Sequence, residues 1–129
     1  MGKSFRDLMV WQRAIDMTTE VYRLTEAFPK AEMYGLISQL RRAAVSVASN
    51  IAEGSGRGTR KEFRQFLKMA RGSVCEVQTQ LVIAGNLGFA AQDRLLHTES
   101  AANEVGRMLN GLLQSLSDNE NGQLPETNN

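Results

Sequence analysis

The chain has 129 residues, 42% of them hydrophobic, which fits one domain with an adequate core and leaves no room for a second. The N-terminus leads into no apolar signal region, and no run of roughly 18 apolar residues could span a bilayer, so we expect a cytoplasmic protein with no membrane partner. The single cysteine, Cys75, excludes an intrachain disulfide, and its neighbours Val74 and Val77 predict a buried, inert thiol.

The net charge of +1 conceals an uneven distribution of charge along the chain. Residues 1–40 hold five Lys/Arg and five Asp/Glu, residues 41–71 hold eight and two, and residues 72–129 hold two and seven. The three parts therefore carry net charges of 0, +6 and −5. The basic middle and the acidic last third could complement each other across subunits, or the basic part could bind an anionic partner.

Apolar residues recur with helical spacing throughout, and no segment alternates with period two over the length of a strand, which predicts an all-α protein. Asp7 is expected to cap a first helix, which ends at Phe28 because the residue before a proline is pushed out of the α region. The apolar stripe expected to face the core comprises Leu8, Trp11, Ile15, Thr18 and Tyr22, widened by Ala14, Val21 and Phe28. A second line with seven-residue spacing comprises Val10, Met17 and Leu24.

A second helix is predicted to begin between Ala31 and Tyr34 and to continue to about Glu53. The side chains expected in its core stripe are Leu36, Leu40, Ala44, Val47 and Ile51. Residues 43–52 contain no charged side chain, whereas a helix with one face in water normally shows charge every turn or so. One short chain has too few other helices to enclose this segment, so we expect other copies of the protein to cover it. The predicted oligomer interface comprises Arg42, Val45, Ser46, Ser49 and Ala52.

The glycine-rich residues 54–58 are expected to end the second helix, and a third helix is predicted to begin at Thr59 and to reach about Leu87. Thr59 and Glu62 have the spacing of a capping box at its start. Gly72 costs about 1 kcal/mol relative to alanine inside a helix, so we expect a neighbouring backbone to come close there. The predicted apolar stripe is Phe63, Leu67, Ala70, Val74, Val77, Leu81 and Ala84.

A fourth helix is predicted from about Ala91 to Leu116, because apolar residues alternate there at three- and four-residue steps typical of bundle packing. Its predicted core positions are Leu95, Thr98, Ala102, Val105, Leu109, Leu112 and Leu116. Short loops place successive helices antiparallel, so residues 1–117 are expected to form one up-and-down four-helix bundle. Residues 118–129 are expected to form a disordered tail.

Enzymatic and metal chemistry find little support in the sequence. His97 is the only histidine and Arg94 stands three residues before it, so the Glu-x-x-His motif of di-metal bundles is absent. The acidic residues show no paired spacing, and Gly54, Gly56 and Gly58 lack the preceding strand and the Gly-Lys-Ser/Thr of a phosphate loop. We therefore expect no enzyme, no metal and no cofactor.

One face of the third helix is strongly basic. Arg60, Arg64, Lys68 and Arg71 recur at steps of four, four and three residues. We call the predicted set of nucleic-acid-binding residues the basic ridge, and it comprises Arg57, Arg60, Lys61, Arg64, Lys68 and Arg71. The ridge could bind a nucleic-acid backbone, or it could be a solvated face that pairs with fourth-helix acids such as Glu99 and Glu104. A weaker possibility is an anion at the start of the third helix, where backbone N–H groups are free.

Several motifs recur in a specific order along residues 5–116, and the most specific of them is the stretch Asn-Ile-Ala-Glu-Gly at residues 50–54. The other residues of these motifs are Leu8, Trp11, Gln12, Ala14, Phe28, Pro29, Tyr34, Gly35, Leu36, Gln39, Arg42, Ala43, Ser46, Phe63, Phe66, Leu67, Ala70, Gly72, Ser73, Glu76, Thr79, Gln80 and Leu81. In this order the motifs resemble the four-helix-bundle family encoded in intervening sequences of bacterial 23S ribosomal RNA genes.

The resemblance implies an up-and-down bundle that assembles into a ring of five, similar to the accessory variability protein of diversity-generating retroelements, which works beside a reverse transcriptase and RNA. It implies no enzyme. Within the second helix, Asn50 is expected to fix packing register and Glu53 to pair with a local arginine such as Arg57. The function predicted is a non-enzymatic, homopentameric accessory protein that binds RNA or DNA through the basic ridge, alone or with a partner protein. The alternative is a protein–protein scaffold that binds no nucleic acid.

Overall fold

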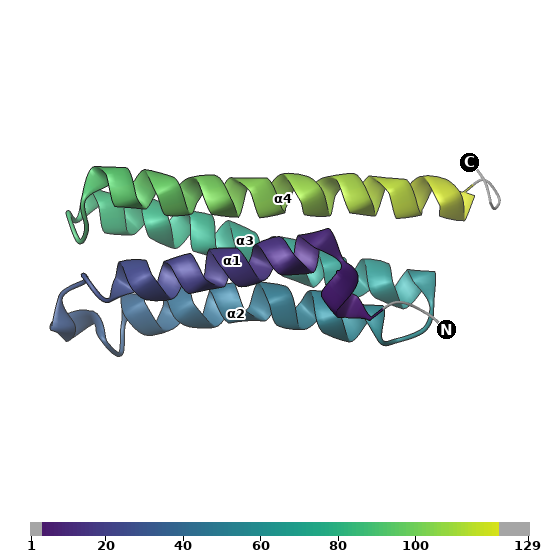
Figure 1. Ribbon diagram of the computed structural model, residues 1–129, viewed down its shortest axis with the longest axis horizontal. Helices are drawn as coiled ribbons and strands as arrows, with labels where there is room; N and C mark the ends of the chain where they lie inside the picture. The colour runs from purple at the N-terminus through teal and green to yellow at the C-terminus, as the bar shows by residue number, and fades with distance from the viewer. Residues whose placement is uncertain (1–3, 122–129) are drawn as a thin grey trace.

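The computed structural model describes residues 4–121, with side chains as far as Ser117. Four antiparallel α-helices account for most of these residues: α1 (Met9–Thr25), α2 (Leu36–Ser55), α3 (Arg60–Asn86) and α4 (Gln92–Asn121). Helix α1 packs against α2 and α4, and α3 packs against the same two helices, so the bundle closes in the order α1, α2, α3, α4 (Figure 1). The all-α, up-and-down bundle predicted for a single chain is confirmed. None of the helices within residues 4–121 is long and apolar enough to cross a bilayer.

Large aliphatic side chains from all four helices meet in one core. Met17, Leu40, Leu81 and Leu109 represent the four helices, and each is fully buried. The predicted core stripe of α2 is buried throughout, and that of α3 is buried except for Phe63, which is half-buried against the core. On α4 the predicted core residues Leu112 and Leu116 are only half-buried, and Leu113 is buried instead, because a helix with 3.6 residues per turn drifts away from a strict seven-residue pattern.

The predicted core stripe of α1 is correct only in part. The predicted second line, Val10, Met17 and Leu24, is buried, as are the residues expected to widen the stripe, Ala14, Val21 and Phe28. In the main stripe Ile15 and Tyr22 are exposed, whereas Leu8 and Trp11 are partly buried against the core. The main stripe is offset from the buried line by one residue, about 100° around the helix. Its member Thr18 donates a hydrogen bond to the Ala44 carbonyl oxygen of α2 at 3.1 Å, so this part of the main stripe lies beside α2.

The first helix also begins differently from the prediction. Asp7 belongs to a short 3-10 helix, η1 (Phe5–Asp7), and Leu8 occupies the N-cap position of α1 without a side-chain hydrogen bond. Asp7 therefore does not cap α1. A second 3-10 helix, η2 (Lys30–Glu32), follows Pro29 in the loop to α2.

The two loops that flank α3 depend on glycines with positive φ. Gly58 has φ +95° in the α2–α3 loop, and the Thr59 hydroxyl then accepts a hydrogen bond from the Glu62 N–H at 3.1 Å, which confirms the predicted cap. At the other end Gly88 has φ +70°, and the Phe89 N–H reaches the Ala84 carbonyl oxygen at 3.0 Å. This is the hydrogen-bond pattern of a Schellman motif, which ends α3 cleanly.

Helices α2 and α3 approach each other very closely. A Cβ atom added at Gly54 would lie 2.6 Å from Phe66 Cβ, so this glycine is required by packing. Two turns earlier in α2, the hydroxyl oxygens of Ser46 and Ser73 are 2.9 Å apart. The close approach predicted at Gly72 is wrong within the chain, because a Cβ there would meet no atom within 4 Å in the part that the structure describes. Gly72 lies on the exposed side of α3.

The last helix is longer than predicted. Helix α4 continues past Leu116 to Asn121, so it includes the first residues of the proposed tail. The rest of that tail, residues 122–129, lies outside the described residues.

Candidate nucleic-acid interface

The basic ridge follows the N-terminal half of α3. Arg57 lies in the loop before the helix, Arg60 is its first residue, and Lys68 and Arg71 follow on later turns. These side chains and that of Lys61 are exposed, while Arg64 is half-buried. Steps of three and four residues place Arg60, Arg64, Lys68 and Arg71 on one face of α3, whereas Lys61 lies about 100° around the helix from Arg60 and Arg57 precedes the helix.

Few carboxylates lie near the ridge. Arg57 pairs with Glu53 across 3.8 Å and stacks over the Phe66 ring at 5.0 Å, so the predicted Glu53–Arg57 pair is confirmed. Within residues 4–117, Arg60, Lys61, Lys68 and Arg71 have no carboxylate at salt-bridge distance. These four side chains consequently present positive charge that residues 4–117 do not neutralise by direct pairing.

One acid of α4 and its histidine contact α1. Glu104 lies 3.5 Å from Arg13 of α1, and the His97 ring nitrogen lies 3.6 Å from Glu20 of the same helix. Neither Glu99 nor Glu104, the acids named in the predicted alternative, pairs with Arg60, Lys61, Lys68 or Arg71 within residues 4–117. The reason is geometric: the half-buried Glu104 carboxylate faces α1, whereas the ridge runs along α3.

The start of α3 is already capped by side chains. The Thr59 hydroxyl accepts from the Glu62 N–H and donates to Glu62 Oε1 at 3.0 Å, so a carboxylate lies at the positive end of the helix dipole. This carboxylate competes with any external anion there. The exposed cations farther along α3 are the stronger feature of this surface.

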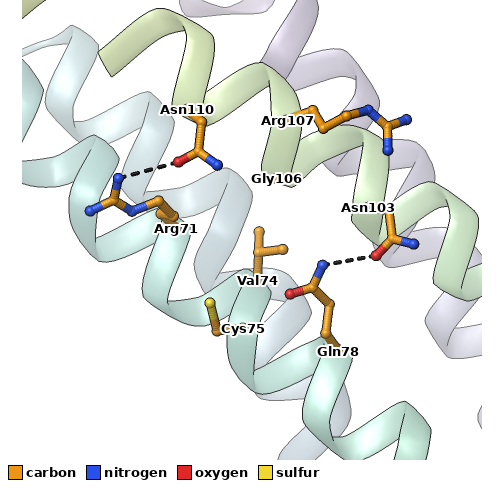
Figure 2. Close-up of a pocket in the computed structure, with 8 residues that line it drawn as sticks. All are labelled: Arg71, Val74, Cys75, Gln78, Asn103, Gly106, Arg107 and Asn110. Carbon is orange, nitrogen blue, oxygen red and sulfur yellow. Dashed lines mark hydrogen bonds between the residues drawn. The ribbon is translucent and has the colours of Figure 1, made fainter. Parts of the chain in front are cut away.

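A groove of about 330 Å³ lies between α3 and α4, beside the Arg71 end of the ridge (Figure 2). Its floor is formed by Val74 and Gly106. Two interhelical hydrogen bonds cross it, from Arg71 Nη1 to Asn110 Oδ1 at 3.2 Å and from Gln78 Nε2 to Asn103 Oδ1 at 2.9 Å. The polar residues at its rim are Arg71, Cys75 and Gln78 from α3 and Asn103, Arg107 and Asn110 from α4.

The groove corrects one prediction and adds residues that the sequence analysis missed. Cys75 is exposed, because it lies about 100° around α3 from the buried Val74 and on the groove side. Arg107 was missed because it stands in the acidic last third of the chain. Its spacing was nevertheless informative, since Asn103, Arg107 and Asn110 repeat the four- and three-residue steps of Arg71, Cys75 and Gln78.

The comparisons with known proteins agree with the fold. The family model described as 23S rRNA-intervening sequence protein matches residues 6–111. The chain belongs to this family. A solved structure from Bacteroides thetaiotaomicron, described as a protein of unknown function from the S23 ribosomal protein family, aligns with a TM-score of 0.74 at 15% identity. The alignment covers 81% of this chain and 98% of that one, and at this identity it shows the fold alone. No curated protein matches the chain.

The predicted oligomer interface lies on the outer side of α2. Arg42, Val45 and Ser49 are exposed, and Ser46 and Ala52 are half-buried. The half-buried Asn50 donates to the Ser46 carbonyl oxygen at 2.9 Å and to the Ser46 hydroxyl at 3.0 Å. Because Ser46 also contacts Ser73, this polar chain links α2 to α3, consistent with the packing role predicted for Asn50.

A polar groove of about 410 Å³ borders this interface between α2 and α3. Arg42, Ser46, Glu76 and Gln80 line it. The outer face of α2 thus presents Val45, which is 43% accessible, beside a groove with charged side chains of both signs: Arg42 of α2 and Glu76 of α3.

Proposed function

We propose that this chain is a non-enzymatic, self-associating accessory protein that binds the sugar-phosphate backbone of RNA or DNA through the basic ridge. The observation that carries the proposal is the exposure of Arg60, Lys61, Lys68 and Arg71 without carboxylate partners among the described residues. Lysine and arginine at a regular helical spacing attract phosphates and release condensed counterions. Such binding depends only weakly on sequence.

Self-association forms the second part of the proposal. The uncharged residues 43–52 and the exposed Val45 support contact with further copies through the outer face of α2. A ring of five, which the family resemblance implies, would repeat the ridge around an axis and make the binding multivalent. A partner protein, by the same resemblance a reverse transcriptase, would meet this assembly on the nucleic acid.

Light scattering tests the assembly. We expect a mass about five times the 14.3 kDa of one chain, and a monomer at micromolar concentration would contradict the proposal. Val45→Asp should dissociate the assembly, because an unpaired charge buried in an interface costs about 3–5 kcal/mol. The helical signal of the dissociated variant should remain, since Val45 is 43% accessible in one chain.

Salt-dependent binding tests the ridge. Replacing Arg60, Lys61 and Lys68 together by glutamine should flatten the plot of log affinity against log salt by about 0.7 for each single-strand phosphate that the ridge no longer neutralises. The matched control replaces Arg23, Lys30 and Arg94, three exposed cations that lie toward the opposite end of the bundle. Both variants remove three positive charges. A flatter salt dependence in the ridge variant alone would therefore show that the ridge, and not the net charge, contacts the phosphates.

The alternative is the protein–protein scaffold. It is supported by the exposed Val45 and the mixed-charge groove beside it, which could receive a different protein instead of another copy. A wild-type assembly that binds neither RNA nor DNA at low salt would overturn the nucleic-acid proposal in favour of the scaffold. Equally weakened binding in the ridge triple variant and its control would instead overturn the ridge as the surface that binds the nucleic acid.

A further inference from the structure

The α3–α4 groove has the dimensions and lining of a ligand site. Its volume of about 330 Å³ lies within the range typical of small-ligand pockets, roughly 300–1,000 Å³. No aspartate or glutamate is among its lining residues, and Arg71 supplies a guanidinium group that also donates to Asn110. Arg107 lies at the rim, where its guanidinium group extends away from Val74 in Figure 2. The groove therefore favours an anionic ligand.

The carboxamides of the groove offer further hydrogen bonds. Gln78 donates through Nε2 to Asn103 Oδ1, so the pair retains the Gln78 oxygen as an acceptor and the Asn103 amino group as a donor. Figure 2 shows the Gln78 oxygen directed toward the space between Val74 and Cys75. A donor and an acceptor side by side match the edge of a nucleobase, as carboxamide side chains do in base recognition.

Gly106 keeps the apolar floor of the groove open. A Cβ atom at this position would lie 3.5 Å from Val74 Cγ1 and 3.9 Å from Gln78 Nε2, which is ordinary contact. Packing within the chain therefore does not require glycine here, unlike at Gly54. A side chain at position 106 would cover Val74 and occupy the groove.

We propose that the α3–α4 groove holds one unstacked nucleotide of a single-stranded nucleic acid bound along the basic ridge. The phosphate lies against Arg71, and the base lies on the Val74 floor with its edge toward Gln78 and Asn103. This inference rests on the proposed function, since the ridge guides the strand to Arg71. It adds a preference for single strands, because a base held in a duplex stack cannot enter the groove.

The test compares Gly106→Leu with Gly111→Leu in the full-length assembled protein. Gly111 is on the same helix, is exposed and has no described atom within 4 Å of an added Cβ, so it is a matched control. The probes are a fluorescent 20-nucleotide RNA, the DNA of the same sequence, and the 20-base-pair DNA duplex. Gly106→Leu should weaken binding of the single strands about tenfold and leave duplex binding within about twofold of wild type. Gly111→Leu should leave all three unchanged.

Two further measurements guard against a folding artefact. Gly106→Ala should fold with a melting temperature at or above that of wild type, and should still weaken single-strand binding in the same direction. Cys75 is the only cysteine and lies at the groove rim, so its alkylation by N-ethylmaleimide reports occupancy. The single-stranded RNA should slow this alkylation at least about threefold, whereas the duplex should not.

The outcomes separate this inference from the proposed function. If wild type binds no probe, the proposed function fails and the groove proposal with it. If wild type binds but Gly106→Leu affects single strands and duplex equally, or the RNA leaves Cys75 alkylation unchanged, the groove proposal is overturned while ridge binding stands. A Cys75 that resists alkylation in the free assembly would also overturn it, since the groove would then be covered by another copy. If Gly106→Leu weakens binding of only the single-stranded RNA or only the single-stranded DNA, the result supports the proposal and identifies which nucleic acid the groove binds.

Discussion

Helix α3 packs against its two neighbours at different distances. On the α2 side, Gly54 allows Phe66 to come so close that a single added Cβ atom would collide with it at 2.6 Å. On the α4 side, Gly106 faces Val74 with room for a Cβ at 3.5 Å, and a groove of about 330 Å³ remains. One helix thus has a closed seam at Gly54 and an open seam at Gly106, and the groove of about 410 Å³ between α2 and α3 borders the closed seam only along the N-terminal half of α2.

The difference shows that a glycine inside a helix does not by itself indicate close packing against a neighbouring helix. At both positions glycine is less favourable for the helix than alanine. At Gly54 close packing of the two helices offsets this cost, whereas at Gly106 the structure of one chain shows no contact that requires glycine. Substitutions at the two seams should therefore have effects of opposite sign.

The largest effect is expected at the closed seam. Gly54→Ala should lower the free energy of unfolding by about 2 kcal/mol, because the added methyl group forces α2 and α3 apart. Thermal denaturation followed by circular dichroism at fixed protein concentration should show a melting temperature lower by roughly 8 °C. Gly56→Ala is the control, since its nearest described atom would be 3.6 Å from the added Cβ. Equal melting temperatures for the two variants would contradict the tight packing at Gly54.

A smaller effect is expected from the hydroxyl contact in the same seam. Ser46→Ala and Ser73→Ala should each cost about 1 kcal/mol, because either change leaves the other hydroxyl without this partner. The double variant should cost less than the sum of the two, with a coupling of about 0.5–1 kcal/mol in a double-mutant cycle. Additive costs measured by chemical denaturation would show that the 2.9 Å contact contributes no stability.

The sequence was sufficient to predict most of the bundle. Helices α2, α3 and α4 each have one dominant apolar stripe, so the predicted and observed cores agree there, with Leu113 replacing Leu112. Helix α1 has two stripes with the same spacing, and periodicity alone cannot decide which one faces inward. The positions of α2 and α4 decide that the line containing Val10 faces the core, and Ile15 and Tyr22 remain exposed.

The candidate site was predictable only in part. The basic ridge depends on spacing within one helix, so its exposed side could be inferred from sequence. The groove depends on the register between α3 and α4, which pairs Arg71 with Asn110 and Gln78 with Asn103. Neither the exposure of Cys75 nor the position of Arg107 at the groove rim follows without that register. The contrast between Gly72 and Gly54 has the same origin, because a close approach is a property of two helices.

The open seam should respond in the opposite direction from the closed one. Gly106→Ala should raise the free energy of unfolding by about 0.5–1 kcal/mol, because alanine favours the helix and its Cβ fits at 3.5 Å from Val74. Gly111→Ala, in open space on the same helix, should give a similar gain and serves as the reference. Chemical denaturation of both variants provides the measurement. A decrease in stability confined to Gly106→Ala would mean that the α3–α4 seam is as tight as the α2–α3 seam.

The smallest effect on stability is expected at the end of the closed seam, where Glu53 pairs with Arg57 across 3.8 Å. Both side chains are about half accessible, so Glu53→Gln should change the free energy of unfolding by less than about 0.5 kcal/mol. The same change removes the carboxylate beside Arg57, and that cation can then contact phosphate. If the ridge binds nucleic acid, the slope of log affinity against log salt should steepen by up to about 0.7 on a single strand.

Glu26→Gln is the matched control for this last prediction, because Glu26 is an exposed carboxylate at the C-cap of α1, toward the opposite end of the bundle from Arg57. It alters the net charge equally and should leave both stability and the salt slope unchanged. A steeper slope in both variants would indicate a response to net charge rather than to Arg57. A destabilisation above about 1 kcal/mol in Glu53→Gln would instead make the pair a structural element of the closed seam, since exposed pairs rarely contribute that much.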